Sequence, residues 1–451
     1  MVKRLKSIVI LSLFSFFILP LSFAAVENIK ISGDINSEAV NRNSSLGLES
    51  NGENNDQFIF SQVRVRFDSD LTGGVSAVVR LINERIWGGT ASSGIGDAEN
   101  SQGNTDINLD LGYLEIKEFF YEPLTLIVGR QELHYGSGLI IGDPDTNQTG
   151  STSKVPTALG DLTLRKSFDA MRAILDFAPW TIDLIFAKAE ESTLNLNDDV
   201  TIVGTNIAYD WNDYSVSELY FFGTDNAPNP NTGVSTIDSK SKVYALGTRT
   251  MFTFNEHLTL GLEGAYQFGD YAAASSASHA HLSAWAALFI SEYRFVDAHN
   301  SKIGFFYGYL SGDDPETSVY EGWNPMFEDQ TPAEIANILL AQTNFQLAGF
   351  TASTMPREDL TLNFKYVHAR YLWGFAGNII QVAKGPAAGN LAYVNPGKKH
   401  LADEFDVSAL YDYSEDVQFM LSGAILTLGN VFTEANDRPA YSIRGGVKVN
   451  F

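Results

Sequence analysis

The sequence predicts an all-β protein, a transmembrane antiparallel β-barrel of about 18 strands with short periplasmic turns and long extracellular loops. Three observations lead to this prediction. The chain ends in a strand-like segment with one apolar and one polar face, strand-like runs recur along the chain, and the connections between these runs alternate between short and long.

The closing segment, residues 441–451, has the period of two that characterises a β-strand with two different faces. Its apolar parity holds Tyr441, Ile443, Val447, Val449 and Phe451. Its polar parity holds Ser442, Arg444, Lys448 and Asn450. The chain therefore stops on an aromatic residue of the apolar face. Such an ending resembles the closing strand of bacterial outer-membrane β-barrels, where a terminal Phe is the habitual assembly signal.

Connections of two kinds separate the strand-like runs. The short ones are rich in turn-forming residues and comprise residues 71–74, 121–123, 178–180, 211–213, 255–257, 297–300, 356–359 and 413–416. The long ones are polar and comprise residues 39–56, 87–106, 132–166, 190–199, 224–239, 269–279, 311–340, 371–399 and 428–438. Because the two kinds alternate, both chain ends fall on the short-turn side, as in outer-membrane barrels. A soluble β-sandwich or propeller has no reason to alternate its loop lengths.

Polar and apolar residues also alternate within individual runs. The pattern is clear in residues 62–68, 302–309, 361–366 and 405–412. Each such strand has an apolar face for lipid and a polar face for a lumen. Closure removes the unpaired strand edges that lipid could not satisfy, and a barrel of about 18 strands is wide enough for an aqueous channel.

The N-terminus has the features of a secretory signal peptide. Lys3, Arg4 and Lys6 precede the apolar stretch 7–23, and small residues at Ser22 and Ala24 fit a cleavage site. We therefore predict a signal peptide over residues 1–24 and a barrel over residues 25–451. An uncleaved membrane anchor is the alternative, but the apolar stretch is at the short limit for a helical span.

Composition excludes several function classes. A formal net charge of −24 argues against nucleic acid as a partner, and the absence of Cys excludes disulfides and thiolate metal sites. No nucleophile–histidine constellation stands out, so we expect neither an enzyme nor a cofactor. Asp403 near His400 and the pair His279 and His281 are the weak candidates for such chemistry. Residues 332–340, within a long loop, are a candidate short amphipathic helix or plug.

If apolar side chains face lipid, the opposite parity lines the lumen. That parity holds the basic residues Arg64, Arg66, Arg80, Lys117, Arg130, Arg172, Arg249, Lys365, Arg444 and Lys448. It also holds the acids Asp68, Glu84, Glu115, Asp183, Glu263 and Asp406. The basic residues concentrate on the first strands and the last one, which are neighbours in a closed barrel, and such a wall can select anions. The alternative is that arginines and acids pair across the lumen and only brace the barrel.

One segment is distinctive enough to indicate a family. Gly129-Arg130-Gln131, Leu133, Tyr135-Gly136 and Gly138 precede a long loop, and Phe168-Asp169-Ala170 with Arg172 follow it. This pattern resembles the alginate-export family of bacterial outer-membrane proteins. The resemblance implies an 18-stranded barrel with an electropositive constriction. It also implies that Arg130 and Arg172 lie at this constriction with Asp169 as an orienting partner, whereas Arg64, Arg66, Arg80, Arg444 and Lys448 are added from strand parity.

The expected function is an outer-membrane porin that passes anionic carbohydrate or small acidic solutes through an Arg/Lys-lined lumen. Besides an anionic polysaccharide or small anionic solute, the expected partners are outer-membrane lipid, lipopolysaccharide and the barrel-assembly machinery. A receptor or adhesin that uses the long loops 132–166, 311–340 and 371–399 is an alternative. An outer-membrane hydrolase is a weaker one.

Overall fold

The computed structural model describes residues 28–43, 55–71, 73–88, 107–144, 162–190, 200–225, 241–272, 279–336, 342–377, 379–381, 391–434 and 438–451. The predicted signal peptide, residues 1–24, lies outside the described residues. Within the described part of the chain, no helix is long and apolar enough to cross a membrane.

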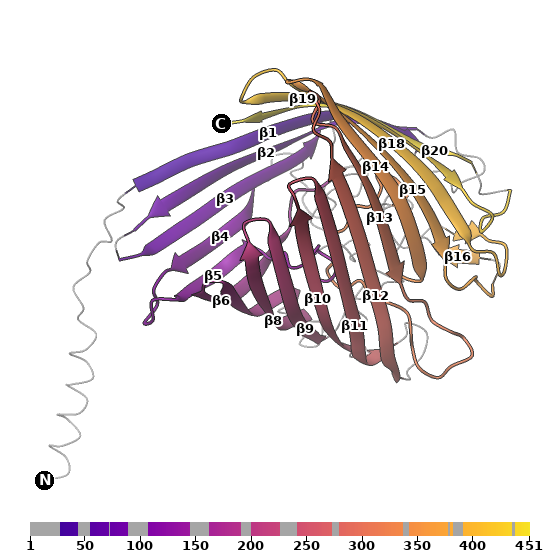
Figure 1. Cartoon of the computed structure of the whole chain (residues 1–451), viewed down its shortest axis with the longest axis horizontal. Helices are drawn as coiled ribbons and strands as arrows, with labels where there is room; N and C mark the ends of the chain where they lie inside the picture. Colours follow the sequence, from indigo (N-terminus) through magenta and orange to yellow (C-terminus); the bar gives the residue numbers. More distant parts are fainter. Residues whose placement is uncertain are drawn as a thin grey trace, which may run out of the picture.

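An 18-stranded antiparallel sheet closes on itself, which confirms the predicted fold class (Figure 1). Its strands are β1 (Asn28–Asn43), β2 (Asn55–Asp70), β3 (Val75–Ile86), β4 (Asn108–Ile116), β5 (Leu124–Glu132), β6 (Ser167–Phe177), β7 (Trp180–Glu190), β8 (Val200–Asn212), β9 (Ser215–Asp225), β10 (Lys242–Phe254), β11 (Leu258–Ala272), β12 (His279–Arg294), β13 (Lys302–Leu310), β14 (Phe345–Arg357), β15 (Leu360–Tyr371), β18 (His400–Asp412), β19 (Val417–Leu428) and β20 (Ala440–Asn450). A separate two-stranded ribbon, β16 (Ile379–Gln381) and β17 (Leu391–Tyr393), lies between β15 and β18 in the sequence.

The short and long connections alternate as predicted, so the barrel has a short-turn end and a long-loop end. The strands extend further into the long connections than the sequence pattern indicates. Residues 39–43, expected in a loop, pair with residues 55–59 as the ends of β1 and β2. The strands continue here because each additional hydrogen bond of the ladder pairs a backbone N–H with a backbone C=O, whatever the side chains are.

β1 and β20 close the barrel, with paired residues running from Asp34 opposite Asn450 to Arg42 opposite Ser442. The last residue continues this ladder. Gly33 N donates to Phe451 O at 2.9 Å, and Phe451 N donates to Gly33 O at 3.0 Å. A Cβ atom on Gly33 would lie 2.6 Å from the Phe451 ring and 2.5 Å from the Arg64 carbonyl oxygen. The Phe451 ring therefore lies so close to position 33 that any residue larger than glycine there would displace its neighbours.

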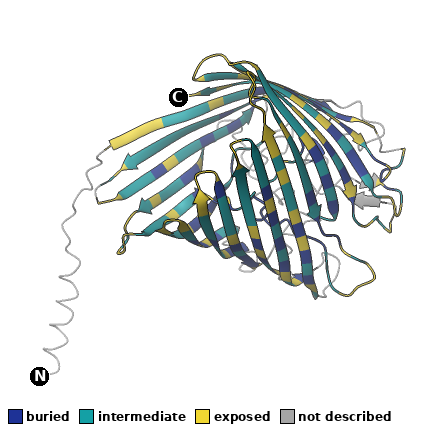
Figure 2. Ribbon diagram, in the orientation of Figure 1, coloured by how far each residue is buried: buried dark blue, intermediate teal, exposed yellow. Residues whose placement is uncertain are grey.

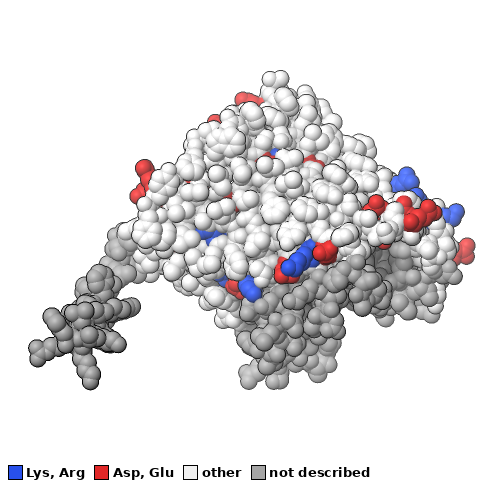
Figure 3. Space-filling view, turned by 90° about the horizontal axis from the view of Figure 1, so that it is seen from below, with Lys and Arg blue, Asp and Glu red and all other residues white. Residues whose placement is uncertain are grey.

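Buried and exposed positions alternate along the strands (Figure 2), and most of the exposed apolar side chains lie on the outward parity. On β1, for example, Ile31 and Ile35 are exposed, whereas Glu38 on the other parity is buried. Few Lys, Arg, Asp or Glu side chains interrupt the face of the barrel drawn in Figure 3. Such an apolar outer surface suits a hydrocarbon environment, in which a lipid-facing charge is costly.

The polar lumenal face expected from strand parity does not continue to the long-loop end. There the inward parity is largely apolar and buried, including Phe168, Ala187, Ile202, Phe222 and Val243. These wall residues belong to one buried cluster with residues of two loops, among them Leu133, Leu139, Ile140, Trp323, Phe327 and Ile335. The inward parity is apolar at this level because it packs against protein rather than water.

The closing seam yields a test of glycine at position 33. Gly33→Ala is expected to lower the free energy of unfolding by about 1–3 kcal/mol, because its new methyl group meets backbone and ring atoms that cannot move freely. Gly445, on the same outer face of the seam, is the matched control, since a Cβ there would lie 3.8 Å from Leu421 in ordinary contact. Urea unfolding in detergent micelles measures both variants. Equal stability of Gly33→Ala and Gly445→Ala would contradict the proposed packing.

Candidate functional site: a constricted lumen

Four arginines that face the lumen line the wall formed by β20, β1, β2 and β3, each beside an acid. Arg64 Nε donates to Asp34 Oδ1 at 2.9 Å, and Arg66 donates to Asp68 with an Nη2–Oδ1 distance of 2.7 Å. The remaining two are Arg444, which donates to Glu38 with an Nη2–Oε2 distance of 2.6 Å, and Arg80, which pairs with both Asp110 and Glu132. All four arginines are on the inward parity of their strands.

The strand register places these cations at successive levels of the wall. Along β1, Arg444 is opposite Val40, Lys448 opposite Asn36, Arg64 opposite Asp34 and Arg66 opposite Ser32. On β3, Arg80 is opposite Arg66. At about 3.3 Å per residue, the row extends over roughly 26 Å of strand, from the long-loop half toward the short-turn end. Within the described part of the chain, no carboxylate forms an ion pair with Lys448.

Arg172 of β6 also lies on the inward parity, beside Ala170. It pairs with Asp183 on β7, and its guanidinium carbon lies 5.8 Å from the centre of the Tyr135 ring. Tyr135 belongs to the loop after β5 and donates through its hydroxyl to Asp183 Oδ2 at 2.6 Å. Burial raises the pKa of this hydroxyl, so it remains a hydrogen-bond donor at neutral pH. Arg172 therefore holds a loop against the wall.

Arg130 and Asp169 lie on the outer face, which corrects their predicted location in the lumen. They pair directly across β5 and β6, with Arg130 Nη1 and Asp169 Oδ2 3.3 Å apart. On β6, Phe168 and Ala170 are 1% and 6% exposed inside the barrel, whereas Met171 on the parity of Asp169 is 50% exposed. Lys188 is opposite Asp169 on β7. Because directly paired residues share a face of the sheet, this ion pair lies outside the barrel.

The motif of the β5–β6 connection forms an inward turn. Leu133, Leu139 and Ile140 are buried, while Gly136 and Gly138 adopt positive φ angles of 61° and 75°, where L-residues are strained. Two wall carboxylates bind the turn, because Gly136 N donates to Glu218 Oε2 at 3.2 Å and Ser137 N donates to Glu263 Oε2 at 3.0 Å. The glycines are therefore explained by backbone conformation and by close approach to the wall.

A second inward segment, residues 320–336 of the β13–β14 connection, packs on the first. Phe327 N donates to Ile140 O at 3.0 Å, and Gly142 N donates to Phe327 O at 2.8 Å. On the wall, Glu404 of β18 accepts hydrogen bonds from the Ile335 and Ala336 amides at 2.5 and 2.7 Å.

These contacts bear on the candidate helix or plug at residues 332–340. Its described part, up to residue 336, enters the lumen, which supports the plug hypothesis. Residues 337–340 lie outside the described residues. The two loops narrow the lumen, and a cavity of about 480 Å³ borders them at Ser137 and Gln330 and reaches Arg249, Ile290 and Lys365 on the wall.

Comparison with known proteins identifies the family. The model of a family described as "Alginate export" matches residues 30–444. The chain belongs to this alginate-export family. No curated protein sequence matches it.

Several solved structures that resemble this chain are outer-membrane porins with very different sequences. OccK8 (OprE) of Pseudomonas aeruginosa has a TM-score of 0.57 at 11% identity, covering 94% of this chain and 98% of its own. OccAB1 of Acinetobacter baumannii has a TM-score of 0.56 at 11% identity, covering 96% and 99%. OprD of P. aeruginosa has a TM-score of 0.54 at 11% identity, covering 95% and 96%. At such identities the likeness shows the fold alone.

Family and fold together place the chain in the bacterial outer membrane as a porin-like channel and not an enzyme. The short-turn end of this alginate-export barrel accordingly faces the periplasm, and its long-loop end faces the cell exterior. The constriction lies between the two.

Several residues that shape the channel escaped the sequence analysis. They are the carboxylates Asp34, Glu38, Asp110, Glu218 and Glu404, which pair with wall arginines or hold the inward loops. Asp34 and Glu38 could have been found, because they alternate with Ile31 and Ile35 in the first strand. No local signal indicates that Glu404 binds a loop, since the bonded amides are far away in sequence.

The Glu404 anchor gives a test of the constriction. Glu404→Ala removes the acceptor of two loop amides, which is expected to weaken docking of the segment by about 1–3 kcal/mol. Single-channel recordings in planar bilayers should then show a higher and noisier conductance than the wild-type channel. Asp169→Ala is the control, because Asp169 pairs with Arg130 on the outer face of the barrel, away from the lumen. An unchanged conductance in Glu404→Ala would exclude this anchoring role.

Proposed function

We propose that this outer-membrane channel passes anionic carbohydrate or small acidic solutes, which interact with the lumenal row of Arg64, Arg66, Arg80, Arg444 and Lys448. The observation that carries the proposal is the order of these cations along one wall, spaced by the register of β1, β2 and β20. A solute carboxylate that leaves one cationic side chain meets the next one only a few strand positions further along the wall. Such repeated weak binding favours passage over retention.

Each arginine is paired with an acid, so the wall has little net positive charge to attract anions in general. The arginines are better suited to bind particular groups of a solute through hydrogen bonds. Arg64 uses Nε in its hydrogen bond to Asp34, whereas Arg66 and Arg444 each donate to their acids through Nε and Nη2. A guanidinium has five N–H donors, so one carboxylate leaves donors for a second ligand. Because the pairs largely neutralise the wall, we expect a modest preference for small anions and a stronger interaction with polyhydroxylated carboxylates.

The bracing alternative gives the arginines a structural role only. Two features support an additional role in transport. The four arginines are partly accessible, with side-chain exposures from 11% to 33%, and Lys448 continues their row. A brace would not require side chains that remain accessible in the lumen.

Blockade of ion current tests the proposal. Short oligomers of a uronic acid, added to a planar bilayer that contains the wild-type channel, are expected to interrupt the chloride current. Neutral glucose oligomers of the same length should interrupt it at least several-fold less often. Arg444→Gln should lower the frequency of uronate blockade by about tenfold, since a charged hydrogen bond contributes roughly 1.5–3 kcal/mol.

Arg130→Gln provides the matched control for this experiment. It removes an arginine from an Arg–Asp pair of the outer face, so uronate blockade should stay at the wild-type level. Equal blockade by neutral and acidic oligomers would refute the proposal, as would equal effects of Arg130→Gln and Arg444→Gln. A complete lack of conductance would favour the receptor or adhesin alternative, in which the barrel serves as an anchor for its loops.

A further inference from the structure

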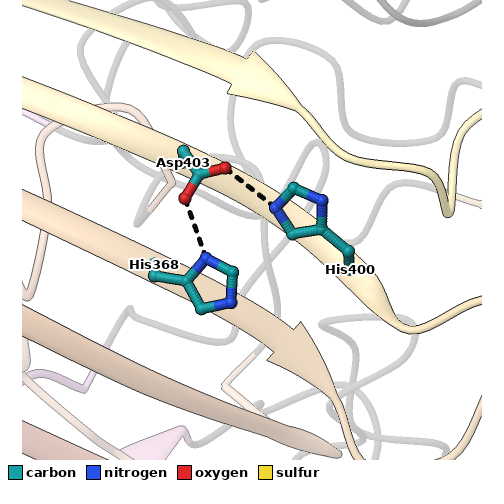
Figure 4. Close-up of side chains that lie close together, drawn as sticks. All are labelled: His368, His400 and Asp403. Atoms are coloured by element: carbon teal, nitrogen blue, oxygen red, sulfur yellow. Dashed lines mark hydrogen bonds and ion pairs between the residues drawn. The ribbon is translucent and has the colours of Figure 1, made fainter.

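A cluster of two histidines and one aspartate lies on the outer face of the barrel near the long-loop end (Figure 4). His368 on β15 is directly opposite Asp403 on β18, and His400 is the first residue of β18. His368 shares its parity with the exposed Tyr366, whereas Val367 and Ala369 between them are buried inside. The cluster therefore lies outside the lumen and takes no part in the proposed transport.

Both oxygens of the Asp403 carboxylate are directed at imidazole nitrogens. His368 Nδ1 lies 2.8 Å from Oδ1, and His400 Nε2 lies 2.9 Å from Oδ2. The two imidazole rings stack with their centres 5.0 Å apart and an interplanar angle of 18°. A set of ligand atoms, one from each of the three residues, lies within 4.8 Å of one another. The cluster is thus assembled from two strands and not from one flexible loop.

We propose that His368, His400 and Asp403 bind a divalent transition-metal ion such as Zn²⁺, Ni²⁺ or Cu²⁺. Two imidazole nitrogens with one carboxylate oxygen are a ligand set that suits these ions and is less suited to Ca²⁺ or Mg²⁺. Zinc lies about 2.0–2.2 Å from such ligands, which places neighbouring ligand atoms about 3 Å apart. The two nitrogen–oxygen separations of 2.8 and 2.9 Å are close to this spacing, and one ligand atom from each of the three residues lies within 4.8 Å of the others.

The surroundings also fit a metal site. Tyr366 donates its hydroxyl hydrogen bond to Asp403 Oδ1 at 2.7 Å, which orients the carboxylate as an outer-shell partner does. The side chains of His368, His400 and Asp403 are 42%, 38% and 30% exposed, so the remaining coordination positions are open to water at the outer surface. On binding, each imidazole would present a nitrogen lone pair to the metal in place of its interaction with the carboxylate.

A second histidine–aspartate contact of the same barrel offers a comparison. His281 Nδ1 lies 3.3 Å from Asp270 Oδ1, and the His281 side chain is 87% exposed. That contact supplies one imidazole and one carboxylate from well-exposed side chains. The cluster at Asp403 adds a second imidazole, greater burial and an orienting hydroxyl.

Cobalt binding tests the proposal. The full chain, purified in detergent and treated with EDTA, is titrated with Co²⁺ while its visible d–d absorption is recorded. We expect a saturable band at one Co²⁺ per chain that Zn²⁺ removes in competition. His368→Gln and His400→Gln should each weaken Co²⁺ binding by at least tenfold, and Tyr366→Phe should weaken it by a smaller factor. His257→Ala, at a short turn, should bind as the wild type does.

Three results would overturn the proposal. The wild type could show no saturable Co²⁺ band, or both glutamine variants could bind Co²⁺ as tightly as the wild type does. The third is that His281→Ala loses the band whereas His400→Gln keeps it. Heat-modifiable migration in gels shows whether each variant is a folded barrel. The glutamine variants keep a polar side chain beside Asp403, and Tyr366→Phe perturbs the site without removal of a ligand, so a folding defect in one variant leaves the others informative.

Discussion

Closure of the sheet between β1 and β20 is the constraint on which the rest of the molecule depends. In hydrocarbon every backbone N–H and C=O group has to be satisfied internally, and a barrel achieves this only if its first and last strands pair. Closure fixes the register of that seam, and the register decides which parity faces lipid. The order of Arg444, Lys448, Arg64 and Arg66 along the wall is a consequence of this register.

A closed barrel of this size is hollow, and the two inward segments narrow it. Their docking explains why an acidic protein has so many carboxylates on its inner wall. Asp34 and Glu38 neutralise arginines, whereas Glu218, Glu263 and Glu404 accept hydrogen bonds from loop amides. A carboxylate suits the second task because it accepts several hydrogen bonds at once and strengthens them by its charge. The acids therefore shape the channel as much as the arginines do.

The sequence predicts the features that depend on local pattern and misses those that depend on distant contacts. Strand parity and alternating connection lengths predict the barrel and the inward faces of Arg64, Arg80 and Arg444. Parity fails for Arg130 because residues 126–128 before it are apolar on both faces. Only the burial of Phe168 and Ala170 on the paired strand reveals its outward direction. The sequence suggests a plug at residues 332–340 but does not predict that the two inward loops pack on each other, because Ile140 and Phe327 meet across a large sequence separation.

The motif that indicates the alginate-export family has a structural meaning here. Gly136 and Gly138 permit the turn, Tyr135 binds Asp183, and Arg130 lies outside the barrel. Tyr135 and the two glycines help to build the constriction, whereas the proposed solute contacts come from wall positions on β2, β3 and β20 that lie outside the motif. A chain could therefore keep the motif and the inward loops while substitutions at those wall positions change its solute. By this reasoning the motif identifies a channel architecture, and under the proposed function the cations along the seam determine the choice of solute.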